Sequence, residues 1–379
     1  MDFQVSKEQE LVRKLVRAFA EREVKPLAAE VDAQHRFPAE TVAQLKRYGF
    51  TGMIVPKSYG GAGADEIAYA IAVEELSRVC AATGVIVSAH NSLALWPLLR
   101  FGTEEQKERY LRPLADGRKL GAFALTEPNA GTDAAGQQTC AVLDGGEWVL
   151  TGTKIFITNG GEADTYVVFA MTDRAKGTRG ISAFVVERPA PGFAIGKVES
   201  KMGIRGSSTA ELVFDGLRLP KDALLGKQGE GFKIAMTTLD GGRIGIAAQA
   251  LGIAQGALDE SVKYTRQREQ FGKPIAKQQA LQFMMADMET RVQASRHLVY
   301  HAAWCKASGR PYGKEAAMAK LFASETATWV TERAVQLHGG YGYTSDYPVE
   351  RMMRDAKITE IYEGTSEVQR MVVSAALLK

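Results

Sequence analysis

The sequence lacks several features that would assign it to a specialised class of protein. It has only three cysteines, Cys80, Cys140 and Cys305, which are widely spaced and form no paired motif. This pattern argues against a disulfide framework or a zinc knuckle and favours reduced thiols in a cytosol. No run of roughly 18 apolar residues occurs, and the charged start MDFQVSKEQELVRK lacks the apolar core of a signal peptide. We therefore expect a cytoplasmic protein with no membrane insertion.

An excess of charge of one sign is also lacking. Lysine and arginine total 47 and aspartate and glutamate 44, which leaves a formal net charge of +3. So small and evenly mixed a charge predicts no nucleic-acid partner. Neither G-x-G-x-x-G after a strand nor G-x-x-x-x-G-K-[ST] is found, which disfavours a Rossmann or P-loop enzyme. His297 and His301 are four residues apart without a third ligand, so we predict no metal site.

The composition that is present, 45% hydrophobic and 24% charged, is that of an ordinary globular protein. A chain of 379 residues exceeds the size of one growing core, so we expect two or three packed units. Residues 1–120 have mainly helical periodicity. Ser6 and Gln9 form a capping-box pattern that predicts a helix start near residue 7, and the Pro97 region predicts a helix interruption.

The middle of the chain has a different texture. The runs WVLTGTKIFITNG, TYVVFAM, ISAFVVE, FAIGKV and AELVFDGLRLP are rich in β-branched and aromatic residues, and Asp144, Gly145 and Gly146 supply a turn between two strands. Such closely spaced strands without helices between them predict an antiparallel sheet or barrel.

The pattern becomes helical again after LLGKQGEGF, with three long helices and a shorter one that suggest a four-helix bundle. The fold class predicted is α+β and multidomain. It comprises an N-terminal helical domain at 1–120, a central antiparallel β domain at 121–230 and a C-terminal four-helix bundle at 231–379.

Two polar stretches are candidates for ligand contact. FALTEPNAGTDAAG, residues 123–136, gathers hydroxyl and amide groups in one turn, as an ordinary loop does. The same groups also suit a ring with amide-like edges or a phosphate. QLHGGYGY, residues 336–343, fits either a helix C-cap or a close backbone approach to a pyrophosphate.

These two stretches carry a family resemblance. ALTEPNAGTDAAG and QLHGGYGYTSDYPVERMMRD resemble the two signatures of the flavin-dependent acyl-CoA dehydrogenases, and KIFITNG, REQFGKP and IYEGTSEVQR also occur where that family has them. The resemblance covers essentially the whole chain, and within the family it is to the short-chain, butyryl-CoA type.

The resemblance implies that Glu363 of YEGT is the catalytic base. A thioester's α proton is weakly acidic, so its removal needs a positioned base whose pKa is raised in a water-poor pocket. As this proton leaves, hydride passes from the β carbon to N5 of FAD, and the Glu363 N–H group is a donor for the thioester oxygen. The implied product is the trans-2-enoyl-CoA.

The resemblance also implies a set of binding residues. The predicted FAD contacts are Phe123, Leu125, Thr126, Thr132, Phe156, Thr158, Arg268, Gln270, Phe271, Gln336, Gly339, Gly340, Thr365 and Glu367. Arg268, Gln270, Phe271, Gln336, Gly339 and Gly340 would reach the FAD of a neighbouring subunit, which implies a homotetramer. The predicted substrate contacts are Thr132, Arg243, Tyr362 and Gly364. Electron-transferring flavoprotein is the implied electron acceptor.

Some residues depart from the family pattern and leave alternatives open. Several relatives have Tyr in place of Phe123 and Trp in place of Phe156, while His90 and Asn91 lie near the expected acyl pocket. A longer, branched or cyclic acyl-CoA, or an oxidase reaction with oxygen, is the alternative within the family. A noncatalytic helical binding or scaffold protein is the alternative from another class. Glu360 and Glu367 are rival carboxylates, interpreted as surface or supporting residues.

Overall fold

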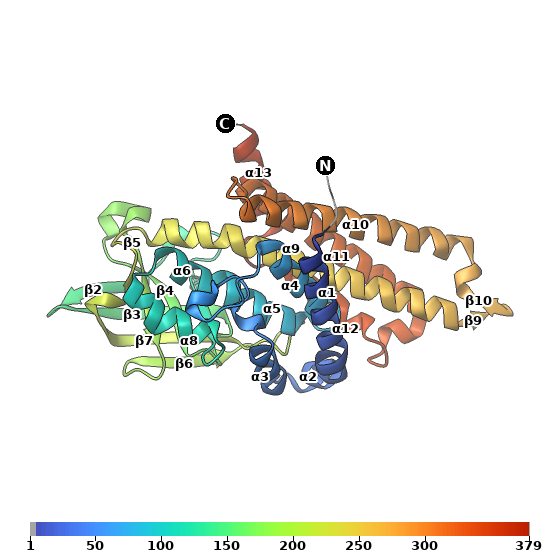
Figure 1. Ribbon diagram of the computed structural model, residues 1–379, viewed down its shortest axis with the longest axis horizontal. Coiled ribbons are helices and arrows are strands. Elements are labelled where there is room, and N and C mark those ends of the chain that lie inside the picture. Colours follow the sequence, from blue (N-terminus) through green and yellow to red (C-terminus); the bar gives the residue numbers. More distant parts are fainter. Residues whose placement is uncertain (1–4, 379) are drawn as a thin grey trace.

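The computed structural model describes residues 5–378. Residues 1–4 and 379, at the outer ends of the predicted first and last domains, lie outside the described residues. The molecule is elongated, with the sheet at one end of its long axis and long helices extending to the other (Figure 1). The predicted order of helical, sheet and helical parts is confirmed.

The N-terminal part is helical, as expected. Helix α1 (Lys7–Phe19) begins at the predicted capping box, where the Ser6 hydroxyl accepts from the Gln9 N–H group and the Gln9 side chain accepts from that of Ser6. The other elements are η1 (Ala20–Val24), η2 (Lys25–Leu27), α2 (Ala28–Gln34), α3 (Ala39–Arg47), η3 (Phe50–Gly52), η4 (Lys57–Tyr59), α4 (Glu66–Ser77), α5 (Ala81–Ala89), η5 (His90–Leu95), α6 (Trp96–Phe101), α7 (Glu104–Gln106), η6 (Lys107–Leu111) and α8 (Arg112–Ala115).

The expected interruption at Pro97 is wrong, because α5, η5 and α6 form one continuous helix. The segment η5 is π-helical, and the Trp96 N–H group bonds the Asn91 carbonyl five residues back. Pro97 lies in the first turn of α6, where the wider π turn accommodates a residue without an N–H group. The stretch Ala81–Phe101 is long and apolar enough to cross a membrane, but 89% of its most apolar window is buried inside the protein.

The central part is an eight-stranded sheet in the order β6-β7-β3-β2-β4-β5-β8, with β1 paired to β4. The strands are β1 (Gly121–Ala124), β2 (Cys140–Asp144), β3 (Glu147–Thr158), β4 (Thr165–Met171), β5 (Ile181–Glu187), β6 (Phe193–Val198), β7 (Thr209–Pro220) and β8 (Leu224–Leu225). The pairing is mainly antiparallel, but β1 and β2 each pair with β4 in parallel. Every residue of β4 is buried, which explains why TYVVFAM reads as a continuous apolar run.

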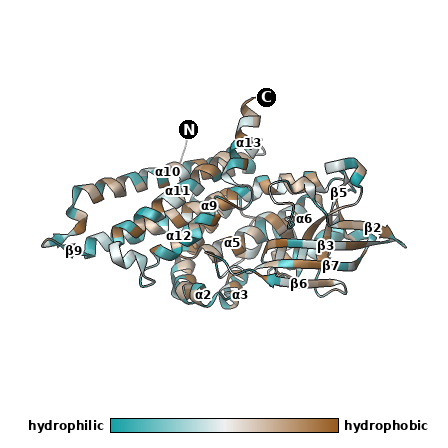
Figure 2. Ribbon diagram, turned by 180° about the vertical axis from the view of Figure 1, so that it is seen from behind, coloured by the Kyte–Doolittle hydropathy of each residue, from teal (hydrophilic) through white to brown (hydrophobic). Residues whose placement is uncertain are grey.

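The C-terminal part is built on α9 (Gly231–Gln267), α10 (Gln279–Ala307) and α11 (Gly313–His338). The short strands β9 (Glu269–Gln270) and β10 (Lys273–Pro274) form a hairpin between α9 and α10, at the end of the molecule farthest from the sheet (Figures 1 and 2). Helix α11 packs against α9, α10, α12 (Val349–Ile358) and α13 (Ser366–Leu377). Helix α9 begins at Gly231, at the end of LLGKQGEGF, where the sequence pattern becomes helical as expected.

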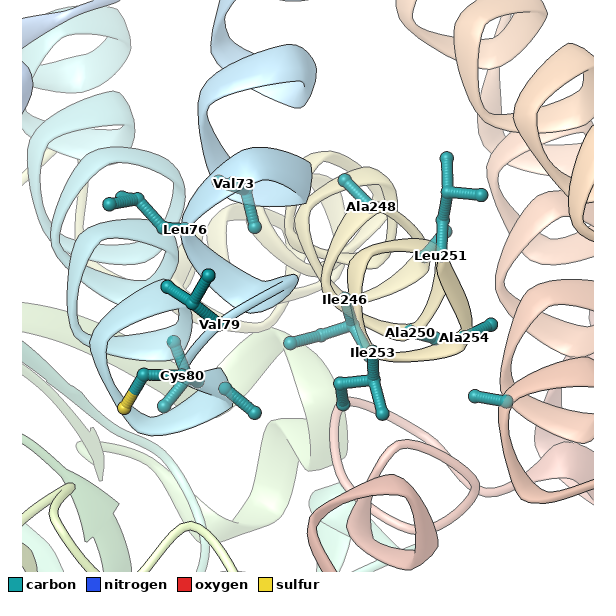
Figure 3. Packing of buried hydrophobic residues seen from close by; sticks show 14 of the residues in the cluster. Val73, Leu76, Val79, Cys80, Ile246, Ala248, Ala250, Leu251, Ile253 and Ala254 are labelled. Atoms are coloured by element: carbon teal, nitrogen blue, oxygen red, sulfur yellow. The ribbon is translucent and has the colours of Figure 1, made fainter. Parts of the chain in front are cut away.

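The largest hydrophobic core joins the N-terminal helices to this bundle. Val73 and Leu76 of α4 and Ile246 and Leu251 of α9 belong to this core (Figure 3), and all four side chains are fully buried. A Cβ atom at Gly252 would lie 2.2 Å from the Glu74 carbonyl oxygen, so only glycine permits this separation of α4 and α9. Each such buried aliphatic side chain stabilises the fold by about 1.5–3 kcal/mol. Helix α9 is therefore packed against helices from both the N-terminal and the C-terminal parts of the chain.

Candidate active site

The turn between α12 and α13 carries Glu363 in an unusual backbone conformation. Both Glu363 and Gly364 have positive φ angles, 52° and 92°. The Thr365 hydroxyl caps α13 by accepting from the Val368 N–H group, which fixes where the turn ends. A bulky residue with positive φ is strained, and such strain clusters at functional sites.

The Glu363 side chain lies against Gly242 of α9, and only a glycine at residue 242 leaves room for it. A Cβ atom at Gly242 would lie 2.2 Å from Glu363 Oε2 and 2.7 Å from Leu93 Cδ2. Glycine in a helix interior is normally unfavourable by about 1 kcal/mol relative to alanine. The Gly241–Gly242 pair was a signal in the sequence, but only the fold reveals that Gly242 makes room for the carboxylate.

The electrostatics of Glu363 suit a proton acceptor. The residue is half-buried, but its Oε2 atom is fully enclosed and has no hydrogen-bond partner within residues 5–378. Burial raises the pKa of Glu363 to about 7, against the opposing charges of Lys320 and Arg243. A carboxyl group with this pKa exchanges its proton near neutral pH, as a general base must.

Two predicted substrate residues lie close to Glu363, since Tyr362 precedes it in the chain and the charge of Arg243 acts on its carboxyl group. Arg243 is buried, and its Nη1 donates to Asp240 Oδ1 at 2.6 Å while its Nε has no partner among the described atoms. Tyr362 donates to the Gln249 side chain, and burial raises the pKa of Tyr362 well above its usual range, so its phenol is neutral. The structure thus places an unsatisfied cationic donor and a neutral aromatic side chain near the carboxylate.

The rival carboxylates do not share this environment. Glu360 forms an ion pair with Lys357 at 2.5 Å, and Glu367 is exposed in the first turn of α13. Neither has an enclosed, unpaired oxygen like that of Glu363.

A second group of predicted residues lies on the sheet. Phe123 packs on Phe169 with ring centroids 4.9 Å apart. The Ile155 N–H group bonds the Thr126 carbonyl at 2.9 Å, which aligns the polar loop with β3. Phe156 is 59% exposed and has a φ of 58°, so its ring is presented outward from this surface. Leu125 is buried, Thr158 is half-buried and Thr132 is exposed.

The polar loop is held by a buried ion pair that the sequence analysis missed. Lys154 Nζ lies 2.7 Å from Glu127 Oε1 and also donates to the Leu125 carbonyl and to Gln137 Oε1, each at 3.0 Å. Glu127 in turn accepts from the Gln138 and Thr139 N–H groups. The inward alternation of Trp148, Leu150 and Lys154 along β3 was the signal that this lysine points into the protein.

A third group lies at the far end of the bundle. Arg268, Gln270, Gln336, Gly339 and Gly340 line a cavity of about 570 Å³. The cavity also includes Tyr341, whose ring lies 5.8 Å from the Arg268 guanidinium carbon. Phe271, at the hairpin tip, is 92% exposed. Two larger hollows, of about 760 and 820 Å³, are lined by other residues and do not include Glu363.

The structure therefore brings the predicted residues into separate groups. The sheet group and the hairpin group occupy opposite ends of the long axis in both views (Figures 1 and 2). The chemistry of both groups fits a flavin dinucleotide. The sheet offers aromatic and hydroxyl side chains at a surface, and the far cavity offers an arginine, amides and two glycines with open space at their Cβ positions.

Comparison with protein families gives three matches that together span nearly the whole chain. Residues 6–118 match the acyl-CoA dehydrogenase N-terminal domain, residues 122–217 the middle domain and residues 229–378 the C-terminal domain.

Among curated relatives, a short-chain specific acyl-CoA dehydrogenase of Clostridium acetobutylicum is 61% identical, covering 100% of both chains. An acryloyl-CoA reductase (NADH) of Anaerotignum propionicum is 54% identical, covering 100% of this chain and 96% of the relative.

Two solved structures superpose on the full length of this chain and of their own. Butyryl-CoA dehydrogenase from Megasphaera elsdenii is 52% identical with a TM-score of 0.99. A chain from a study of the electron transferring flavoprotein of Acidaminococcus fermentans, on the mechanism of flavin-based electron bifurcation, is 57% identical, also with a TM-score of 0.99.

Proposed function

The chain belongs to the acyl-CoA dehydrogenase family, and from this premise we propose that it oxidises a short-chain acyl-CoA, such as butyryl-CoA, to the trans-2-enoyl-CoA with FAD as cofactor. The observation that carries the proposal is the enclosed, unpaired Oε2 of Glu363 on a carboxyl group whose pKa is about 7. The identity to short-chain relatives supports the choice of substrate.

Glu363 removes the α proton of the thioester. Its unpaired Oε2 accepts the proton, and the Glu363 N–H group donates to the thioester oxygen as negative charge develops there. Bound FAD would supply the oxidising power, as the acceptor of a hydride from the β carbon. Arg243 binds the CoA portion through its planar guanidinium, and Tyr362 lines the acyl pocket together with the Gly364 backbone and Thr132.

The residues that hold FAD come from two subunits in this proposal. Phe123, Leu125, Thr126, Thr132, Phe156, Thr158, Thr365 and Glu367 bind the cofactor of their own subunit. Arg268, Gln270, Phe271, Gln336, Gly339 and Gly340 bind that of a neighbour. The separation of the two groups along the molecule supports this arrangement, since one chain does not place both around one ligand (Figure 1). A homotetramer follows as the proposed assembly.

The proposed electron acceptor is an electron-transferring flavoprotein. A chain 57% identical to this one comes from a study of such a protein, which supports the pairing. We place the enzyme in the cytoplasm.

Anaerobic spectra test the function directly. The purified protein is expected to be yellow and to bleach on addition of butyryl-CoA, with slower or weaker bleaching by longer and branched acyl-CoAs. Colourless protein that neither binds FAD nor responds to any acyl-CoA would support the noncatalytic scaffold instead. Formation of peroxide in air at the rate of turnover would support the oxidase.

A second candidate is the reverse reaction in the cell, in which an enoyl-CoA is reduced. It is favoured by the acryloyl-CoA reductase (NADH) that is 54% identical over the whole chain. Glu363 would then return a proton to the α carbon, because a catalyst serves both directions. NADH-dependent reduction of crotonyl-CoA in the presence of an electron-transferring flavoprotein would distinguish this role.

A further inference from the structure

A buried lysine outside the proposed catalytic and binding set touches the turn that carries Glu363. Lys320 lies within α11 and is 0% exposed. An ammonium group without water requires hydrogen-bond partners, since its desolvation is costly. Lys320 Nζ donates to the carbonyl oxygen of Gly364 at 2.7 Å.

The same carbonyl oxygen has a second donor from α13. Gln369, also 0% exposed, donates through Nε2 to Gly364 O at 2.7 Å and to Glu363 O at 3.3 Å. Two side chains from different helices therefore hold the peptide that follows the base. Because a positive φ angle is strained at a non-glycine residue such as Glu363, this turn persists only when its surroundings fix it.

Lys320 also acts on Glu363 through its charge. The described groups that act electrostatically on Glu363 or Lys320 are Arg243 on α9, Tyr69 on α4, and Glu360, Tyr362 and Glu367 on the chain around the turn, with Asp240 paired to Arg243. The positive charge of Lys320 opposes the effect of burial on the pKa of Glu363 more strongly than that of Arg243 does. Burial lowers the pKa of Lys320 itself to about 8.

We propose that Lys320 is a positioning residue for the base: its ammonium group clamps the Glu363–Gly364 turn together with Gln369, and its positive charge stabilises the Glu363 carboxylate. The inference rests on the proposed function of Glu363. It assigns two separable roles, of which Gln369 shares only the clamp.

Variants of the FAD-loaded enzyme separate the two roles. Lys320→Met removes the charge and one donor, Lys320→Arg keeps the charge, and Gln369→Met removes only the other donor. Lys314→Met, in the first turn of the same helix with a side chain that is 40% exposed, is the matched control. FAD content and thermal unfolding establish that each variant is folded.

The first measurement does not depend on turnover. Infrared pH titration of the FAD-loaded enzyme without substrate follows the Glu363 carboxyl band, assigned by its absence in Glu363→Gln. We expect the midpoint in Lys320→Met to rise by about one pH unit, because an opposite charge has been removed. We expect no shift in Gln369→Met or Lys314→Met, and at most a small one in Lys320→Arg.

The second measurement is the rate of flavin reduction by butyryl-CoA against pH. A one-unit rise in midpoint leaves about a tenth of the base ionised at pH 7 in place of half, so the lost charge is expected to slow Lys320→Met about fivefold there. This part of the loss recovers at high pH, whereas the part due to the lost clamp donor remains. Gln369→Met is expected to be slower by a similar factor at every pH. Should Lys320→Met not fold, Lys320→Gln carries the same test.

Two results would overturn the inference. An unmoved carboxyl midpoint and rate profile in Lys320→Met, while Glu363→Gln is inactive, would remove Lys320 from this role and leave the proposed function intact. Near-normal flavin reduction in Glu363→Gln would remove the proposed function and this inference with it.

Discussion

Two regions of the molecule, the turn around Glu363 and the cavity beside the β9–β10 hairpin, differ in how complete they are within one chain. Glu363 is surrounded by α9, α11 and η5 of its own chain, and its Oε2 is enclosed. The hairpin region presents Phe271 at 92% and Tyr343 at 89% exposure. The difference suggests that proton transfer is built into each subunit, whereas cofactor retention depends on assembly.

The strongest test of this contrast is Glu363→Gln. We expect flavin reduction by butyryl-CoA to fall by about 10³–10⁴-fold, because the shape remains while the base is lost. FAD content and assembly should be unchanged. Anaerobic stopped-flow absorbance measures the rate, and Glu360→Gln is the matched control, expected to stay near normal. Rapid reduction in Glu363→Gln would reject the assignment of the base.

Gly242→Ala tests the enclosure of the carboxylate without altering its chemistry. The added Cβ atom, 2.2 Å from Glu363 Oε2, must displace the side chain. A displacement of roughly 1 Å is expected to slow flavin reduction by about 100-fold. Single-turnover rates and thermal unfolding, measured together, separate a displaced base from a lost fold. An unchanged rate would mean that the space at Gly242 is not needed for catalysis.

Arg268→Ala tests the other region. We expect FAD to bind about 10–100-fold more weakly, as for the loss of a charged hydrogen bond, and the assembly to weaken. The ratio of FAD to protein after gel filtration and the elution volume measure these effects, and excess FAD should restore the rate of reduction. Arg266→Ala is the control, because Arg266 is an exposed arginine in the last turn of α9, close to Arg268 in the chain. Full FAD occupancy in an intact tetramer would contradict the predicted role of Arg268.

The pH profile of the wild-type enzyme tests the ionisation of Glu363, and its expected effect on the rate is the smallest of these predictions. Because the pKa of Glu363 is raised to about 7, its ionised and active form is lost as pH falls below that value. Flavin reduction at pH 6 is expected to be about one tenth of its high-pH limit. Rates with butyryl-CoA between about pH 5.5 and 9 check this, and a flat profile across that range would argue against proton removal by Glu363.

Local patterns predicted most of the fold. The capping box at Ser6 and Gln9, the turn at Asp144–Gly146 and the long apolar strands all depend on neighbours in the sequence, and each occurs where expected. The helix interruption expected at Pro97 was wrong, because the π-helical segment before this residue changes the backbone hydrogen bonding and accommodates the proline. The parallel pairing of β1 with β4 also escaped prediction, since it joins segments separated by the β2–β3 hairpin.

Only those site residues that belong to a recognisable sequence motif were predicted. Glu363 followed from YEGT, but its neighbours Gly242 and Lys320 come from distant helices, and no local pattern connects them. The sequence offered only indirect signals. These were two glycines within a helical stretch and a lysine among the small apolar residues of AAMAKLFASETA. Contacts of this kind depend on how α9 and α11 pack, which periodicity alone does not specify.

The positive φ of Glu363 also bears on the resistance of the protein to heat. An acid held at an unfavourable backbone angle with an enclosed, unpaired oxygen weakens the native state, and increasingly so as pH rises from the ordinary carboxyl pKa of 4.5 to the raised value of about 7. Glycine at this position would relieve both penalties. Selection for heat tolerance alone would therefore tend to erase the residue on which turnover depends, and its presence marks a compromise between durability and activity.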